Sequence, residues 1–362
     1  MTRHRKIRTP DPLLAIVDPR DAAESAGLVY VTEDEPGFSR RRAGKGFSYR
    51  DTEGKPIRDP DVRARIRKLA IPPAYSDVWI CARPNGHIQA TGRDARGRKQ
   101  YRYHPSFREV RDSAKYAHML EFAAALPALR KRVAADMALP GLPREKVLAT
   151  VVHLLETTMI RVGNEDYARQ NKSYGLTTLK SRHVDVNGSE LRFAFKGKSG
   201  KTWRVTLKDR RLTRIMRAIQ ELPGQHLFQY LDDAGGRHDV GSEDVNAYLR
   251  EISGKSITAK DFRTWTGTLL AATALAKYEG FDSAATAKRN IRAVIEEVAA
   301  QLGNTPTICR KCYIHPHILD GYLAADLVLD TTPERCAELD GDLLLRPEEA
   351  AVIAFLRREL GA

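Results

Sequence analysis

The sequence predicts an α+β protein with a small, mainly β N-terminal domain and a larger, mainly helical domain that carries one β-hairpin insertion. Three observations lead to this prediction. Between residues 28 and 110, short runs of β-branched and aromatic residues alternate with Gly, Pro, Asn and Asp. From about residue 111, apolar residues recur at every third or fourth position, as in amphipathic helices. Segment 183–207 interrupts the helical pattern with two alternating runs joined by Asn187-Gly188, a strong hairpin signal.

The N-terminal part has the pattern of short strands separated by turns. Each candidate strand ends at residues that favour turns, such as Gly, Pro, Asn and Asp. The candidate segments are LVYVTED (28–34), FSYRDTEGK (47–55), DVWICARPNGHIQATG (77–92) and KQYRYH (99–104). We therefore expect a β-rich domain over residues 28–108, preceded by an N-terminal tail of residues 1–27.

The second part is predicted to be helical on both sides of the hairpin. The segments with helical spacing are 116–138, 145–171, 256–280 and 283–303. Thr258 is a candidate N-cap of the third helix, whereas Ser283 opens the fourth and Gly303 closes it. A length of 362 residues suits two domains. These patterns predict a mainly helical domain over residues 109–330 and a C-terminal extension of residues 331–362.

The charge is basic and unevenly distributed along the chain. Lys and Arg outnumber Asp and Glu by 60 to 46, and residues 1–110 hold 23 bases against 14 acids, which is +9 of the net +14. Basic surfaces attract polyanions, because each neutralised phosphate releases condensed counterions. The charge alone is equally compatible with a nucleic acid partner and with a basic protein that is merely soluble.

The sequence does not predict export or membrane insertion. Its N-terminal apolar run is too short and too interrupted for a signal peptide, and no window approaches the roughly eighteen apolar residues of a membrane span. Four cysteines are too few for a disulfide scaffold. We therefore expect a soluble protein of the reducing cytoplasm with no membrane partner.

A basic and aromatic run covers residues 91–104 (TGRDARGRKQYRYH). Its cations are Arg93, Arg96, Arg98, Lys99 and Arg102, interleaved with Gln100, Tyr101 and Tyr103. On a strand the two tyrosines share one face and Gln100 takes the other. Arg and Lys neutralise phosphates, and Gln and Arg can pair with a base edge. The run therefore indicates nucleic-acid contact, with a charge-protected strand edge as the alternative.

No nucleotide-binding loop is present. The sequence GKS occurs at 197–199 and at 254–256, but a phosphate loop needs a Gly five positions before each GK pair. Those positions hold Arg192 and Leu249. ATP is therefore not expected as a cofactor.

The segment CRKCYIHPH (309–317) allows two interpretations. Cys309, Cys312, His315 and His317 are all residue types that bind zinc, but the two pairs are much closer together than in usual zinc modules. The alternative is that Tyr313 is a nucleophile. A phenol with an ordinary pKa near 10 is almost fully protonated at neutral pH, so it needs cations nearby.

Three cations on predicted ordered elements are candidates for that role. Arg161 lies on or at the end of an otherwise apolar helix, Lys198 lies at the hairpin tip, and Arg263 lies in the first turns of another helix. Phosphoryl chemistry without a carboxylate-bound metal would draw its charge stabilisation from such side chains. Each residue taken alone fits a solvated or paired surface base better.

Five separated motifs together resemble the type IB DNA topoisomerases, specifically the small bacterial branch related to the poxvirus enzymes. In chain order they are GRKQYRYH (97–104), RVGNEDYA (161–168), GKSGK (197–201), KDFRTW (260–265) and LGNTPTICRKCYIHP (302–316). The resemblance extends from roughly residue 28 to about residue 330. It implies two lobes that clamp double-stranded DNA, and an enzyme that relaxes positive and negative supercoils as a monomer in the nucleoid.

The resemblance also implies roles for individual residues. Tyr313 would attack a DNA phosphodiester and form a 3′-phosphotyrosyl link. Arg161 and Arg263 would bind the non-bridging oxygens, and Lys198 would protonate the departing 5′-oxygen. Asn304 stands where many relatives have a histidine, and its amide can still donate a hydrogen bond to phosphate. No metal, ATP or other cofactor is implied.

The DNA contacts implied by the resemblance lie in two places. Gln100, Tyr101 and Tyr103 match the family's DNA-contacting strand, beside the phosphate-neutralising Arg96 and Lys99, and Tyr167 matches a contact just beyond Arg161.

Two other protein classes stay open at this point. A tyrosine recombinase would share the Arg, Lys and Tyr chemistry, but it usually has a His where this chain has Lys260. Recombinases also more often begin with a helical domain than with a β one. The second alternative is a non-enzymatic DNA-binding protein with a zinc-stabilised tail.

Overall fold

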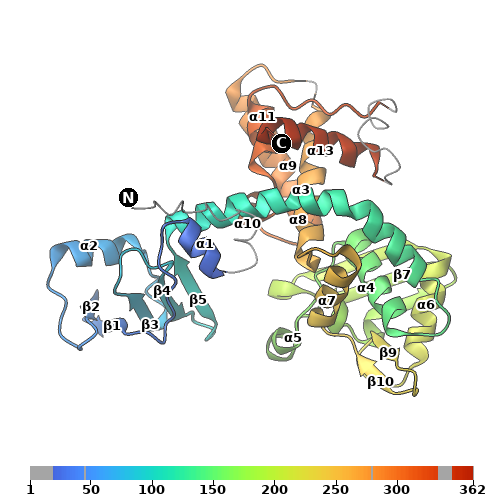
Figure 1. The fold of residues 1–362 in the computed structure, drawn as a ribbon, viewed down its shortest axis with the longest axis horizontal. Helices are drawn as coiled ribbons and strands as arrows, with labels where there is room; N and C mark the ends of the chain where they lie inside the picture. The colour runs from blue at the N-terminus through green and yellow to red at the C-terminus, as the bar shows by residue number, and fades with distance from the viewer. Residues whose placement is uncertain (1–18, 45, 279, 333–344, 362) are drawn as a thin grey trace, which may run out of the picture. The chain divides into compact units, whose positions relative to one another are not determined.

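The structure, a computed structural model, describes residues 19–44, 46–278, 280–332 and 345–361. The chain forms two compact units, Met1–His118 and Met119–Ala362 (Figure 1). The α+β prediction is confirmed, because the described part of the first unit is built around a small antiparallel sheet and that of the second is mainly helical with a β insertion.

Unit 1 is built around a five-stranded antiparallel sheet with strand order β2-β1-β3-β4-β5. The strands are β1 (Gly37–Ala43), β2 (Gly46–Arg50), β3 (Ser76–Cys81), β4 (Ile88–Arg93) and β5 (Lys99–Tyr103). Helix α2 (Pro60–Lys68) begins at Asp59, whose carboxylate accepts hydrogen bonds from two main-chain N–H groups of the first turn. Ile66 of α2 packs on Ile80 and Ala90 of the sheet, which makes one core of this unit.

The predicted N-terminal tail is partly helical. Residues 19–25 form helix α1 (Pro19–Ser25), and its buried Ala22 and Ala23 pack against Phe107. Residues 1–18 of that tail lie outside the described residues. The small alanine side chains allow close contact, so this part of the predicted tail belongs to the core of unit 1.

Helix α3 (Pro105–Asp136) contributes to both units. Phe107 stacks on Tyr103 within unit 1, whereas Phe122 packs edge-on against Phe262 within unit 2. The predicted domain boundary at 108/109 therefore falls inside this helix, ten residues before the division of the contacts after His118. The spacing of apolar residues shows where strands give way to helix. The division between the units depends instead on tertiary contacts, which change further along α3.

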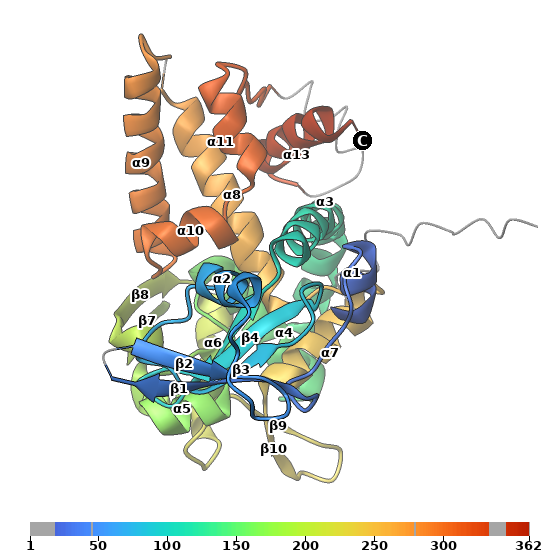
Figure 2. The same ribbon diagram turned by 90° about the vertical axis from the view of Figure 1, so that its left-hand side faces the viewer.

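Unit 2 is mainly helical. Its first helices are α4 (Arg144–Thr158), α5 (Glu165–Asn171), α6 (Arg210–Glu221) and α7 (Ser242–Ser253). Helices α8 (Ala259–Ala276), α9 (Ala284–Gln301) and α11 (Pro316–Leu323) pack beside one another, with the short α10 (Pro306–Cys312) between α9 and α11 in the chain (Figure 2). The predicted caps are found where expected: Ser283 Oγ accepts the N–H of Thr286, and Thr258 precedes α8.

The hairpin insertion is a three-stranded antiparallel sheet of β6 (Val184–Asn187), β7 (Glu190–Lys196) and β8 (Thr202–Lys208). Alternate residues of β7, including Phe193 and Phe195, are buried against the helices. The tip between β7 and β8 is a short 3-10 turn, Lys198–Gly200. A smaller pair, β9 (Gln229–Leu231) and β10 (Arg237–Asp239), was not predicted from the sequence.

The C-terminal helix α13 (Pro347–Leu360), within the predicted extension, packs onto the helices of unit 2. Phe355 is buried so closely against Gly321 that a Cβ there would lie 2.5 Å from its ring. Glu349, with 2% of its side chain exposed, accepts two hydrogen bonds from Arg130, and Arg130 also bonds Glu156. Helix α13 is thus part of the same folded unit.

Replacing Glu349 with Ala is expected to lower the free energy of unfolding by roughly 3 kcal/mol, the low end for a broken buried pair, because Arg130 keeps Glu156. Burial raises the pKa of Glu349, but the bonds from Arg130 outweigh it and hold the pKa below its usual value. The stabilisation should be complete above about pH 4.3 and disappear as the pH falls through the folded-state pKa.

Urea unfolding at neutral and acidic pH measures this difference. Glu348→Ala is the control, because Glu348 is exposed on the same helix. An equal loss of stability in both variants at neutral pH would contradict the role of the buried pair.

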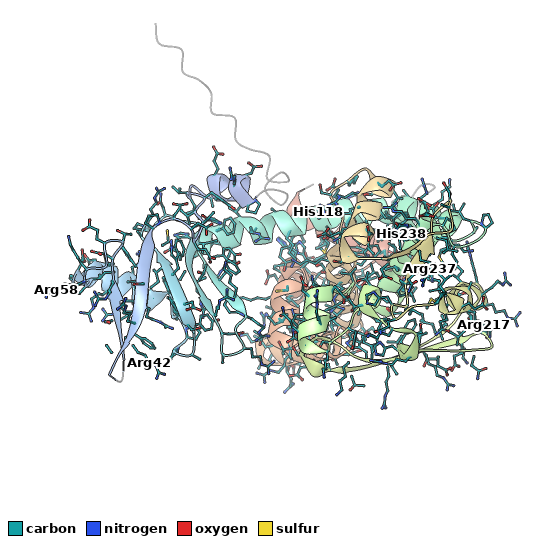
Figure 3. All side chains as sticks on the ribbon, turned by 90° about the horizontal axis from the view of Figure 1, so that it is seen from below. Arg42, Arg58, His118, Arg217, Arg237 and His238 are labelled. Atoms are coloured by element: carbon teal, nitrogen blue, oxygen red, sulfur yellow. The ribbon has the colours of Figure 1, made fainter. Side chains whose placement is uncertain are left out.

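Exposed arginines occur on both units, as Figure 3 shows for Arg42 and Arg58 in unit 1 and for Arg217 and Arg237 in unit 2. The basic excess is therefore carried on the surface of each unit. Among the described helices, none has the length and apolar character needed to cross a membrane.

Candidate active site

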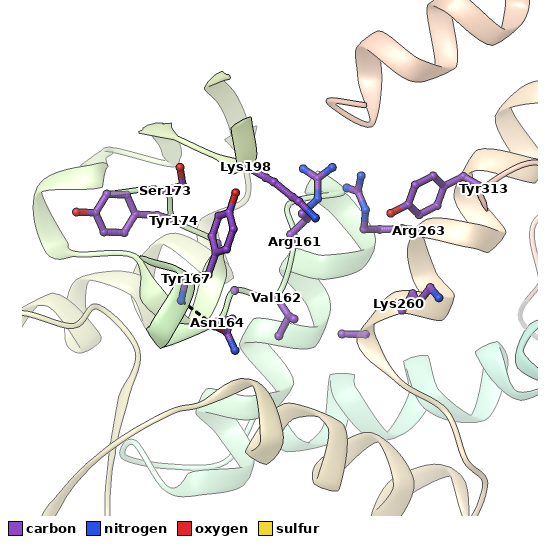
Figure 4. Close-up of a pocket in the computed structure, with 13 residues that line it drawn as sticks. Arg161, Val162, Asn164, Tyr167, Ser173, Tyr174, Lys198, Lys260, Arg263 and Tyr313 are labelled. Atoms are coloured by element: carbon purple, nitrogen blue, oxygen red, sulfur yellow. Dashed lines mark hydrogen bonds between the residues drawn. The ribbon is translucent and has the colours of Figure 1, made fainter. Parts of the chain in front are cut away.

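A pocket of about 400 Å³ in unit 2 collects four of the five predicted catalytic residues, together with the predicted DNA contact Tyr167. Arg161, Lys198, Arg263 and Tyr313 all line it, and Figure 4 shows their side chains directed into the same space. Lys260 is a further cation in the lining, and the described lining residues include no Asp or Glu. Such a pocket attracts an anion and offers it several charged donors.

Arg161 follows α4 on a segment held by main-chain hydrogen bonds. Its carbonyl accepts the N–H of Leu176 at 2.9 Å, and a Cβ on Gly175 would lie 2.6 Å from that carbonyl oxygen, so this close approach requires glycine. The Arg161 guanidinium donates to the side-chain oxygen of Asn304. Burial lowers the pKa of Arg161, while nearby Tyr313 acts in the opposite direction.

Arg263 lies on α8 and is almost completely buried, with 4% of its surface exposed. Its guanidinium donates to the carbonyls of Met159 and of Leu302, the second at 2.6 Å, so neutral acceptors orient the charge without cancelling it. Burial lowers the pKa of Arg263, and the charge of Arg161 lowers it further. Its guanidinium carbon lies 5.3 Å from the centre of the Tyr313 ring.

Tyr313 ends the short helix α10, and its N–H donates to the Cys309 carbonyl at 2.9 Å. Thr268 Oγ1 donates a hydrogen bond to the Tyr313 carbonyl at 3.2 Å and accepts the N–H of His315 at 3.0 Å. A Cβ on Gly267 would lie 2.6 Å from the Tyr313 carbonyl. Helix α8 therefore holds the tyrosine segment by its backbone and leaves the phenol in the pocket.

The turn that follows α9 orients the cations of the site. Three consecutive carbonyls of this turn each accept a hydrogen bond from a cation: Leu302 from Arg263 at 2.6 Å, Gly303 from Arg161 at 3.4 Å and Asn304 from Lys201 at 2.8 Å. Carbonyls at a helix C-terminus have no partner within the helix and carry its negative dipole end, so they favour cations. Gly303 permits this turn because its φ is +61°.

Asn304, in the same turn, provides a hydrogen-bond donor beside Arg161. Its side-chain oxygen accepts from Arg161, and its buried Nδ2 has no hydrogen-bond partner among the described residues. A buried donor without a partner costs free energy unless a ligand satisfies it. The amide is therefore suited to bind an anionic oxygen.

Lys198 and Tyr167 reach the pocket from separate elements. Lys198 is at the tip of the β7–β8 hairpin, where Ser199 and Gly200 have φ of +65° and +74°. Tyr167 is in the first turn of α5, and its N–H donates to the side chain of the N-cap Asn164 at 2.8 Å. All five predicted catalytic residues and Tyr167 are thus assembled in unit 2.

Residues 104–325 match the protein family described as eukaryotic DNA topoisomerase I, catalytic core. Residues 46–94 match the family described as bacterial DNA topoisomerase IB, N-terminal domain. The chain belongs to the type IB DNA topoisomerase family. It is therefore an isomerase of the DNA topoisomerase class, and the resemblance in its motifs is confirmed. This membership also separates the chain from the tyrosine recombinases and from non-enzymatic DNA-binding proteins.

Viral topoisomerases are similar over most of the chain. DNA topoisomerase 1B of Acanthamoeba polyphaga mimivirus is 33% identical over 294 residues, which cover 79% of this chain and 87% of the relative. DNA topoisomerase 1 of rabbit fibroma virus is 24% identical over 80% of this chain and 92% of the relative. For DNA topoisomerase 1B of vaccinia virus, strain Western Reserve, the identity is 23% over 63% of this chain and 70% of the relative.

In this topoisomerase, the predicted DNA-contacting strand is β5 of unit 1. Tyr101 stacks on Tyr103 with ring centres 5.9 Å apart, so the two tyrosines share a face as expected. Acidic side chains bind the polar residues on both faces of this strand: Lys99, on the tyrosine face, pairs with Glu33, and Gln100, on the opposite face, donates to Asp94 at 3.1 Å. Arg96 is exposed beside them.

Two of the possible zinc ligands next to Tyr313, Cys309 and His315, have roles in packing and helix capping. Cys309 is buried in α10, where burial raises the pKa of its thiol to about 11. His315 caps α11 by accepting the N–H of His317 at 3.1 Å. Within the described residues, no three or more His, Cys, Asp or Glu side chains group closely enough to hold a metal ion.

Sequence reasoning missed three residues of this topoisomerase that contact the site. Lys260 lines the pocket, and Lys201 and Trp203 contact the turn after α9. Lys201 is the last residue of the GKSGK motif, so the motif could have indicated it as a site residue. Nothing in the local sequence distinguishes Trp203 from an ordinary strand residue.

Proposed function

We propose that the protein relaxes positive and negative DNA supercoils by cutting one strand, forming a 3′-phosphotyrosyl link through Tyr313, and resealing the strand. The observation that carries this proposal is the pocket itself, in which Tyr313 meets four cations and no carboxylate among the described lining residues. A phosphodiester bound there would meet its nucleophile and its charge-stabilising donors together.

The cleavage step exchanges one phosphoester bond for another. The Tyr313 oxygen forms a bond to phosphorus, the bond from phosphorus to O5′ breaks, and the phenolic proton leaves to water. Lys198 gives a proton to the departing O5′, while Arg161 and Arg263 bind the non-bridging oxygens as their charge increases. Resealing is the reverse. Because an ester bond is conserved, the cycle requires neither ATP nor a metal ion.

Charged and aromatic residues on β5 and in the loop before it, together with Tyr167 of the pocket, support DNA as the partner. We propose that Arg96 and Lys99 neutralise phosphates of a duplex, that Gln100, Tyr101 and Tyr103 contact the same duplex, and that Tyr167 contacts it near the cleavage site. Binding should weaken steeply with salt, because phosphate contacts release counterions.

Relaxation of both positively and negatively supercoiled plasmid by the purified protein, with chelator and without ATP, tests the function. We expect both substrates to be relaxed, with broad topoisomer distributions. Relaxation that requires ATP or an added divalent metal, or that acts on one sign alone, would overturn the proposed mechanism.

Replacing Asn304 with Ala is expected to slow single-turnover cleavage by ~10²–10³, the usual cost of one oxyanion donor. The change removes the buried Nδ2 donor and the acceptor for Arg161. Asn304→His is the matched comparison, because its ring can also donate to the phosphate. Cleavage by the Ala variant at the parent rate would exclude a role for this residue.

A further inference from the structure

The side chain of Trp203 lies between two glycines that belong to different parts of the site. A Cβ on Gly197, at the start of the hairpin tip, would lie 2.6 Å from Trp203 Cδ1. A Cβ on Gly303, in the turn after α9, would lie 2.7 Å from Trp203 Cζ2. The nitrogen-containing edge of one indole therefore touches both backbones, and both approaches exclude any larger residue.

A second contact joins the same two segments. The Lys201 ammonium donates to the Asn304 carbonyl at 2.8 Å. The Lys201 carbonyl accepts the N–H of Gly197 at 2.8 Å and closes the hairpin tip. Trp203 is itself supported by Phe195 on the paired strand, with nearly parallel rings 6.4 Å apart. The tip is thus attached to the turn by an apolar and a polar contact.

Lys198 depends on these attachments for its position. No hydrogen bond or ion pair holds its ammonium among the described residues, and the two residues after it have left-handed backbone conformations. The turn, in contrast, is held through Leu302 and Gly303 by the two arginines of the pocket. Docking the hairpin on this turn gives Lys198 a defined place relative to both arginines.

We propose that Trp203 is a positioning residue that docks the Lys198 hairpin on the turn at residues 302–304, so that the ammonium meets the departing 5′-oxygen. This rests on the proposed acid role of Lys198. Proton transfer requires the donor within about 2.6–3.2 Å of the oxygen, and a misplacement of about 1 Å can cost ~10² in rate. A hairpin released from the turn would keep Lys198 but lose this alignment.

Single-turnover cleavage of two matched DNA duplexes tests the assignment. One carries an ordinary phosphodiester, and the other carries sulfur in place of the bridging 5′-oxygen, a leaving group that needs no proton. We expect Trp203→Ala to slow cleavage of the ordinary duplex by ~10² while cleaving the sulfur duplex within a few-fold of the parent rate. The double variant with Lys198→Ala should be no slower than Lys198→Ala alone.

Further variants separate the possible outcomes. Arg204→Ala, exposed on the same strand, is the control and should leave both rates unchanged. Lys201→Ala removes the polar contact with the turn and creates no cavity. It should also slow cleavage of the ordinary duplex more than that of the sulfur duplex, so it tests the assignment even if Trp203→Ala fails to fold. If Trp203→Ala and Lys201→Ala slow both duplexes equally, or neither, the positioning role is wrong. If the sulfur duplex does not rescue Lys198→Ala, the acid role of Lys198 fails instead.

Discussion

Replacing Tyr313 with Phe is expected to abolish DNA strand cleavage while DNA binding remains close to that of the parent. The substitution removes one oxygen, the proposed nucleophile, and keeps the ring beside Arg263. The backbone bonds of this residue to Cys309 and Thr268 are unaffected. The pocket should therefore keep its shape and lose only its chemistry.

Denaturing gels of the covalent protein–DNA adduct measure cleavage, and fluorescence anisotropy with a labelled duplex measures binding. Tyr278→Phe is the matched control, because Tyr278 is 40% exposed in the same unit and does not line the pocket. A Tyr313→Phe variant that still forms the adduct would remove Tyr313 as the nucleophile. Loss of binding together with cleavage would indicate instead that the phenol mainly holds DNA.

The second large effect is expected at Arg263. Its replacement with Ala should lower the cleavage rate by ~10³ or more, because one charged donor to the transition state is lost. It should also lower the free energy of unfolding by about 1–3 kcal/mol for each buried carbonyl left without a donor, those of Met159 and Leu302.

Arg263→Lys separates these two contributions. Lysine keeps a positive charge, but a single ammonium cannot satisfy two carbonyls and a phosphate with the geometry of a guanidinium. We expect this variant to be more stable than Arg263→Ala and still slower than the parent by ~10². Arg292→Ala, an exposed arginine on α9, is the control.

Single-turnover cleavage and urea unfolding of the same preparations give both quantities. An Ala variant that is destabilised but cleaves at the parent rate would assign Arg263 to the fold alone. A variant that is slow with unchanged stability would show that the two carbonyls find other donors, and the transition-state role would stand.

The class of the fold and the main residues of the site could be predicted from the sequence alone. Period-two and helical spacing depend on local backbone geometry, so they correctly indicated a β-rich part, a helical part and the hairpin that carries Lys198 at its tip. The motifs around Arg161, Arg263 and Tyr313 indicated the family, which the matches over residues 46–94 and 104–325 confirm.

The contacts that hold these residues in place could not be predicted, because they join distant parts of the chain. Arg161 and Gly303 are 142 positions apart in the chain, and no local pattern predicts that the end of α9 orients the cations through its free carbonyls. The sequence also gives no sign that Trp203 contacts two glycines or that Gln100 donates a hydrogen bond to Asp94. Helices α1 and α13 joined the folded units for the same reason: spacing reports a residue's own backbone, whereas burial depends on partners that only folding brings together.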